Sequence, residues 1–152
     1  TRRRCIDRAS QIIVWNATAI PWPVRTLHYA DRIEVAKAQE HGERRRAGHD
    51  NAVEQLLGAR SLLERLSHTD RPLSLTLLLG RAAVRQSQGT SRKDHIGQVQ
   101  QLIDMAANKV ATVLVLPESA DGSMMADRGP FTLYNFETQA SVAELPSWEE
   151  ES

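Results

Sequence analysis

The chain has 152 residues, of which 41% are hydrophobic and 25% charged, and this is the composition of an ordinary globular domain with one core. Nineteen basic and nineteen acidic residues cancel, but residues 117–152 carry eight acidic residues and one basic residue. An acidic tail competes with nucleic acid for the basic surface before it. The charge distribution therefore speaks against DNA or RNA binding and favours a protein partner or a parent complex.

The longest apolar run, Val110 to Leu116, is far shorter than the roughly 20 residues that cross a membrane. The single Cys5 cannot form an internal disulfide, so we expect a reducing intracellular compartment, either cytoplasmic or organellar. Because the chain begins with Thr1 rather than Met, we expect a processed or trimmed chain.

The first predicted elements are a strand and a helix. Residues 11–15, QIIVW, are rich in β-branched side chains and predict a buried strand, which Pro21 and Pro23 end because proline cannot donate to a ladder. From Leu27 to Glu43 the pattern becomes helical, with a thin apolar stripe.

A second helix is predicted from Asn51 to Ser67. Asn51 and Glu54 have the spacing of a capping box, in which each side chain satisfies a free backbone N–H of the first turn. Residues at alternating steps of four and three then share one face. This predicted stripe is Ala52, Leu56, Ala59, Leu63 and Leu66.

Residues 73–116 predict a strand, a helix and a second strand. Leucines alternate with polar residues over 73–79, residues 81–90 form a loop with one helical turn at first, and a helix runs from Ser91 to Ala107. Its predicted apolar stripe is Ile96, Val99, Ile103, Ala106 and Val110. The strand VATVLVL follows and stops at Pro117. Such a unit normally makes two parallel neighbours with a right-handed crossover.

A further strand is predicted over residues 131–137, and residues 138–152 are polar and acidic. The whole pattern predicts a single α/β domain over residues 1–137, with a mixed or mostly parallel sheet flanked by helices, followed by a loosely ordered acidic tail over 138–152. We expect Leu63, Ile103 and Val113 to lie together in its core.

The sequence contains no complete catalytic constellation and no glycine-rich phosphate loop. Ligands of open α/β sheets bind outside the carboxyl ends of the strands. At those ends we expect a ligand-binding site made of Arg81, Glu118 and Asp121. The competing interpretation is that Glu118 simply begins a polar surface loop.

Residues 39–50, QEHGERRRAGHD, concentrate charge. His41 and His49 would lie about two helical turns apart, too far to share one ion, so no metal site and no cofactor is predicted. We interpret the stretch as solvated surface, with the alternative that Arg44, Arg45 and Arg46 form a basic docking patch for a partner.

The stretch KDHIGQVQQLIDMAANKVATVLVLPES resembles the first helix and second strand of nitrilase-type amidases, in which a strand ends in Pro-Glu. IIVWNATAIPW is similar to the matching stretch of the apolipoprotein N-acyltransferases of that superfamily, with Asn16-Ala17 in place of Pro-Glu. The resemblance would make Glu118 a general base. The family also needs a later Lys and a later Cys, and this sequence has neither after Glu118. These residues alone therefore cannot form an active nitrilase, and we do not assign the family.

The residues favour a non-enzymatic interaction or regulatory module that acts within a larger protein or complex. Trp148, which lies among the glutamates of the tail in ELPSWEEES, is expected to dock into an apolar pocket of a partner or to fold back on its own domain. The alternative function is a small-ligand-binding or degenerate hydrolase-like α/β domain that uses Arg81, Glu118 and Asp121.

Overall fold

The structure is a computed structural model, and it describes residues 2–40, 42, 45–68, 70–85, 90–117 and 129–145. The helices of this part of the chain are α1 (Arg2–Arg8), the 3₁₀ helix η1 (Trp22–Val24), α2 (Leu27–Glu40), α3 (Arg45–Leu66), α4 (Arg81–Arg85) and α5 (Arg92–Ala107). The strands are β1 (Gln11–Asn16), β2 (Ser74–Gly80), β3 (Thr112–Leu116), β4 (Phe131–Asn135) and β5 (Val142–Glu144).

The described strands form one mixed sheet in the order β3-β2-β1-β4-β5. β1, β2 and β3 are parallel neighbours, with Val14 opposite Leu77 and Leu77 opposite Val113. β4 pairs antiparallel with β1, and β5 pairs antiparallel with β4. The predicted α/β domain with a mixed sheet, including its parallel β2–β3 pair, is confirmed.

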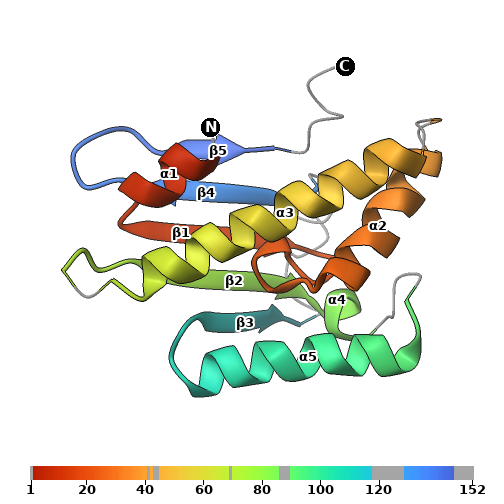
Figure 1. Cartoon of the computed structure of the whole chain (residues 1–152). Helices are drawn as coiled ribbons and strands as arrows, with labels where there is room; N and C mark the ends of the chain where they lie inside the picture. The colour runs from red at the N-terminus through yellow and green to blue at the C-terminus, as the bar shows by residue number, and fades with distance from the viewer. Residues whose placement is uncertain are drawn as a thin grey trace.

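The long helices lie on one face of this sheet. The chain passes from β1 to β2 through α2 and α3, and from β2 to β3 through α4 and α5, moving toward the same edge both times. Two right-handed crossovers in one direction place their helices on the same side. Figure 1 shows this arrangement, with α3 across the middle of the sheet and α5 along β3.

The core lies between this helical layer and the sheet. Successive side chains of a strand point to opposite faces, so every second residue of β1 and β2 faces the helices. These residues are nearly fully buried, and they pack with side chains from η1, α2, α3 and α5. The largest of the fully buried side chains in this cluster are Tyr29, Tyr134, Ile6, Ile12, Ile20, Leu62, Leu77 and Leu79.

One predicted helix start is confirmed and the other is wrong. The Ser91 hydroxyl accepts a hydrogen bond from the Asp94 backbone N–H at 3.1 Å and caps α5. α3 instead begins at Arg45, six residues before the predicted Asn51, so Asn51 lies inside the helix. Gly48 lies in this added part of the helix, against α2. A Cβ on Gly48 would lie 2.8 Å from the Glu34 carbonyl oxygen, so glycine lets α3 cross close over α2.

The prediction that Leu63 and Ile103 lie in the core is wrong. Leu63 is 45% exposed and Ile103 is 54% exposed, whereas the preceding residues, Leu62 and Leu102, are 1% and 3% exposed. Val113 is partly buried against the core, as expected. In α5 the buried stripe is turned by one residue, or about 100°, from the predicted one, whereas in α3 the predicted Ala52 and Ala59 are buried and Leu63 is the exposed member of the stripe.

Buried polar residues cause the shift. In α5 the buried face is His95, Gln98, Leu102 and Met105. The His95 Nε2 donates to the Val84 carbonyl at 2.8 Å, and the Gln98 side-chain oxygen accepts from the Thr26 N–H at 3.1 Å. These hydrogen bonds compensate the loss of water, so two polar residues occupy positions that the hydrophobic pattern gives to Ile96 and Val99.

The sheet extends into the segment that was predicted as the tail. β5 lies at 142–144, and its Glu144 carboxylate accepts hydrogen bonds from Arg2 of α1, the shortest at 2.8 Å. The same guanidinium lies 4.6 Å from the centre of the Trp22 ring. Arg2 thus holds β5 against α1 and η1.

Paired substitutions test the helix phases. We expect Leu62→Ala and Leu102→Ala each to lower the free energy of unfolding by about 2–5 kcal/mol, because each leaves a cavity in the core. The neighbouring changes Leu63→Ala and Ile103→Ala should cost less than about 1 kcal/mol, since both side chains are half exposed. Urea denaturation measures all four. Equal losses within each neighbouring pair would contradict the observed phases.

Candidate functional site

The predicted ligand site at the carboxyl ends of the strands is described only in part. Arg81 begins α4 directly after β2, and it is exposed. Glu118 and Asp121 lie outside the described residues, so their proximity to Arg81 stays a prediction. Two features of the described sheet bear on it. The strand order does not reverse among β1, β2 and β3, and a Cβ on Gly80 would lie 2.2 Å from the Ala17 carbonyl oxygen. Crevices for ligands open where that order reverses.

Polar side chains do gather near the end of β1, but they hold one another. The Arg25 guanidinium is buried and donates to the Gln55 side-chain oxygen at 2.8 Å and to the Glu34 carboxylate at 3.3 Å. The Gln55 amide donates to the same carboxylate at 2.7 Å. Arg25 also donates to the Ile20 carbonyl at 2.5 Å, which fixes the loop after β1.

The charges of this cluster are balanced inside the protein. Burial lowers the pKa of Arg25, because it removes water from the charged guanidinium, and the Glu34 carboxylate opposes this effect. Burial likewise lowers the pKa of Lys37, whose ammonium lies 3.5 Å from the same carboxylate. The carboxylate of Glu34 thus serves three neighbours. We interpret the cluster as the joint between the β1 loop, α2 and α3, and not as a reaction centre.

A different feature stands out at the β3 edge of the sheet. Among the described strands, β3 has a neighbour on one side only. Its sequence TVLVL has no charged residue and no proline, and Leu114 and Val115 are 49% and 45% exposed. Exposed edge strands of natural proteins usually carry a lysine, a proline or a bulge that discourages pairing with another chain. This edge has neither of those residues.

α5 carries a second exposed apolar stripe, on the side of the sheet to which Val115 points and Leu114 does not. Ile96 and Ile103 are two turns apart on the helix and both are more than half exposed. Gln100 and Ala107 complete the same stripe and are also exposed, so the stripe contains no charged residue. Surface helices normally place charged residues on the side that faces water. We call Ile96, Ile103, Leu114 and Val115 the β3–α5 surface.

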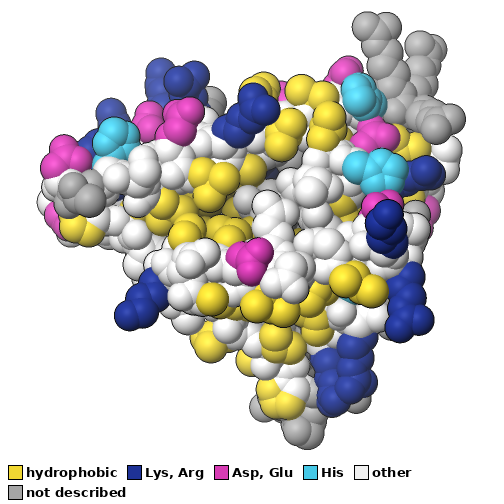
Figure 2. All heavy atoms as spheres, turned by 60° about the horizontal axis from the view of Figure 1, so that its bottom comes forward, with side chains coloured by type: hydrophobic (Ala, Val, Ile, Leu, Met, Phe, Trp, Pro, Cys, Tyr) yellow, Lys and Arg dark blue, Asp and Glu magenta, His cyan; other side chains and the backbone are white. Residues whose placement is uncertain are grey.

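Figure 2 brings the bottom of Figure 1 forward, so that the side with α5 and β3 faces the viewer. Apolar side chains form several patches across this face, and basic side chains lie toward its border. Exposed apolar surface of this kind commonly marks a contact with another molecule.

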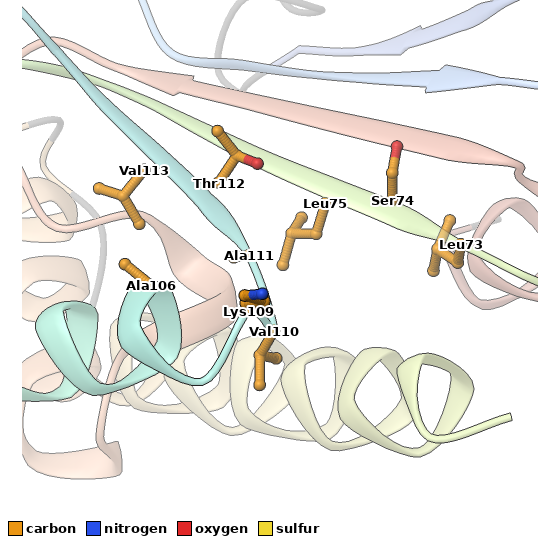
Figure 3. Close-up of a pocket in the computed structure, with 9 residues that line it drawn as sticks. All are labelled: Leu73, Ser74, Leu75, Ala106, Lys109, Val110, Ala111, Thr112 and Val113. Carbon is orange, nitrogen blue, oxygen red and sulfur yellow. The ribbon is translucent and has the colours of Figure 1, made fainter. Parts of the chain in front are cut away.

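A shallow hollow adjoins this surface at the amino ends of β2 and β3. Its volume is about 570 Å³, and Figure 3 shows that its lining comes from the start of β2, the last turn of α5 and the start of β3. The lining residues are Leu73, Ser74, Leu75, Ala106, Lys109, Val110, Ala111, Thr112 and Val113. The hollow is lined by apolar side chains together with Ser74, Lys109 and Thr112, and it lies at the opposite end of the strands from Arg81.

Lys109 is the charged residue of that lining, and its backbone is unusual. Its φ of 57° is left-handed, a conformation that usually falls to glycine after a helix. The N–H of Lys109 donates to Ala106, and the N–H of Val110 donates to Met105 at 2.9 Å. These two bonds end α5 and turn the chain directly into β3, so they fix how α5 lies along the edge strand.

The opposite edge of the described sheet is protected. β5 has only three residues, and Glu144 brings a carboxylate to it. Burial lowers the pKa of Arg2, whereas the hydrogen bonds and the charge of Glu144 raise it. The net effect is a raised pKa of Arg2. A short strand with a paired charge is a poor template for another strand. The two edges therefore differ in what they can bind.

Whether Arg44, Arg45, Arg46 and Trp148 bind a partner stays a prediction. Arg44 and Trp148 lie outside the described residues. Arg45 and Arg46 are the first residues of α3, and their side chains lie outside the described part of the structure. Sequence reasoning missed the β3–α5 surface because it assigned Ile96 and Ile103 to the core.

Comparison with known families adds one finding. A family model described as Domain of unknown function (DUF5753) matches residues 4–151. The chain belongs to this family. No curated protein and no solved structure matches the chain. The DUF5753 match includes all the described elements from β1 to β5, so the β3–α5 surface lies within the family domain.

Two further properties of this DUF5753 domain concern its described part. No group of three or more His, Cys, Asp or Glu side chains there is arranged to hold a metal ion. None of the helices there is long and apolar enough to span a membrane. The Cys5 thiol is free and partly buried.

Glu34→Gln tests the structural role of the buried cluster. The change keeps the shape of the side chain but removes its charge, so it leaves the buried Arg25 guanidinium without a counter-charge. We expect a loss of about 3–5 kcal/mol in the free energy of unfolding. Glu40→Gln, at an exposed position of the same helix, is the control and should cost less than about 0.5 kcal/mol. Similar losses for both variants in urea would refute the structural interpretation.

Proposed function

We propose that this domain is a non-enzymatic interaction module of a larger protein or complex, and that the β3–α5 surface contacts its partner. The observation that carries the proposal is the pair of half-exposed residues, Leu114 and Val115, on an uncharged edge strand. The exposed stripe on α5 lies on the same side of the sheet as Val115.

Two free-energy terms favour a contact there. Removing apolar surface from water contributes about 25 cal/mol per Å², and exposed leucine, isoleucine and valine side chains supply that area. The outer backbone groups of β3 can also pair with a further strand. A partner that adds a strand at β3 uses both terms, because main-chain hydrogen bonds give affinity and the side chains give specificity.

The polar residues of the described part support a binding role over catalysis. Arg25, Glu34, Gln55, His95 and Gln98 each bond to another part of the same chain. Their hydrogen bonds join the loops and helices behind the sheet, so these side chains contribute to stability. The patch Arg44–Arg46 and the tail residue Trp148 remain separate proposals for partner contacts, and neither is needed for the β3–α5 surface to bind.

Site-specific photocrosslinking tests the proposal. Leu114 is replaced by p-benzoylphenylalanine, and the protein is irradiated in a native extract and also alone at micromolar concentration. We expect a covalent adduct of defined mass from position 114, because the partner covers this side chain. Leu57, which is similarly exposed on α3, is the matched control position and should give no such adduct.

A second variant shows whether the adduct depends on the whole surface. Ile103→Glu places a charge in the α5 stripe and should reduce the adduct at position 114 strongly, without lowering the melting temperature by more than a few degrees. If positions 114 and 57 give the same products, or if neither gives an adduct, the β3–α5 surface is not the contact site.

A further inference from the structure

We propose that the partner at the β3–α5 surface is a second copy of this chain, joined by antiparallel pairing of the two β3 strands around a two-fold axis at Leu114. This inference rests on the proposed function and names the partner of the same site. It would join two five-stranded sheets into one continuous sheet.

The β3 sequence is suited to pairing with itself. A two-fold interface uses the same patch on both copies, so each residue meets either its own copy or a reciprocal partner. With the axis at Leu114, the two Leu114 side chains lie opposite each other, Val113 lies opposite Val115, and Thr112 lies opposite Leu116. All five residues are uncharged, so no like charges meet across the pair. Apolar and β-branched residues face one another at the centre.

The position of α5 adds a second contact. α5 lies on the helical face and runs along β3, as Figure 1 shows, and it is joined to β3 by only residues 108–111. Extending the sheet past β3 therefore brings the α5 helix of the second copy to the same side as the first. The stripe of Ile96, Gln100, Ile103 and Ala107 has no charge that would oppose its own copy. Both layers of the domain are thus compatible with the same two-fold axis.

The position of the hollow is compatible with the proposed pairing of the two β3 strands. Val113 lines the hollow, and the proposed register places Val115 of the second copy opposite Val113. That valine side chain would lie at the rim of the hollow, on the helical face of the joined sheet. The contact would remove apolar surface of both copies from water at the point where each is half exposed.

The other edge of the described sheet could not make an equivalent pair. β5 is three residues long, and its Glu144 is engaged with Arg2. A two-fold axis at its middle residue, Ala143, would pair only three residues of each copy and would bury fewer side chains. Charge and length therefore select β3 as the edge at which a second copy joins.

The first measurement is the mass of the purified full chain in solution over a range of concentrations, by sedimentation or light scattering. We expect a species of twice the 17.0 kDa chain mass. Leu114→Lys should raise the dissociation constant at least about tenfold, because it places two ammonium groups opposite each other at the axis. Val142→Lys puts the same charge on the similarly exposed edge strand β5, and it should leave the dissociation constant unchanged.

The second measurement tests the register. Residues directly opposite in an antiparallel pair have Cα atoms about 4.5–5.5 Å apart, which a disulfide can span. Leu114→Cys should therefore form a disulfide with its own copy under mild oxidation, identified by mass spectrometry as two identical peptides joined at position 114. Leu116→Cys lies on the same face of the strand, but its two copies would be about 13 Å apart along the strand, so it should not. The unchanged chain, which contains only Cys5, is the control for background oxidation.

The outcomes separate this inference from the proposed function. A dimer that is weakened by Leu114→Lys and linked by the disulfide of Leu114→Cys supports it. A chain that stays monomeric at all concentrations, or a dimer that is linked by Leu116→Cys instead, overturns it. In the monomeric case, an adduct between position 114 and a different protein in the extract would preserve the proposed function, whereas the absence of any adduct would remove both.

Discussion

The two right-handed crossovers from β1 to β2 and from β2 to β3 set the layout of this domain. Because both move toward the same edge, α2, α3 and α5 are placed on one face, and β3 becomes the last strand of the described sheet on that side. The same constraint puts α5 beside the edge strand. It also keeps the strand order from reversing among the parallel strands. In many α/β proteins a ligand crevice opens at the point where that order reverses.

The two sheet edges differ in charge and exposure, and the proposed function rests on this contrast. At one edge Arg2 and Glu144 hold a short strand in place with a paired charge. At the other, Leu114 and Val115 are half exposed on a strand without charge, next to an uncharged stripe on α5. The buried Arg25–Glu34 cluster supports the helical layer from inside. The polar chemistry of the described residues is thus largely structural, while their most unusual surface is apolar.

The sequence predicted β1 to β4 and the parallel β2–β3 pair, because alternation, proline positions and the Ser91 cap are local signals, but it missed the short strand β5. It missed the buried side of α5 and the exposure of Leu63 on α3, whereas Ala52 and Ala59 of the predicted α3 stripe are buried. His95 and Gln98 occupy the buried face of α5 because the Val84 carbonyl and the Thr26 N–H, which are distant in sequence, are their hydrogen-bond partners. The first residues of α3, which the sequence did not predict as helix, include Gly48 against α2. The sequence did not reveal the β3–α5 surface for the same reason. The local sequence pattern around Ile103 is the same whether this side chain is buried or exposed.

Hydrogen–deuterium exchange at residues 112–116, measured as a function of protein concentration, tests the central claim most directly. Amides on an unpaired edge exchange rapidly, and they become protected when another strand accepts their hydrogen bonds. The account predicts that protection of β3 rises with concentration in the pure protein, while exchange at 142–144 in β5 stays constant. Exchange in β3 that is equally fast at every concentration up to the millimolar range would contradict the pairing of two copies at this edge.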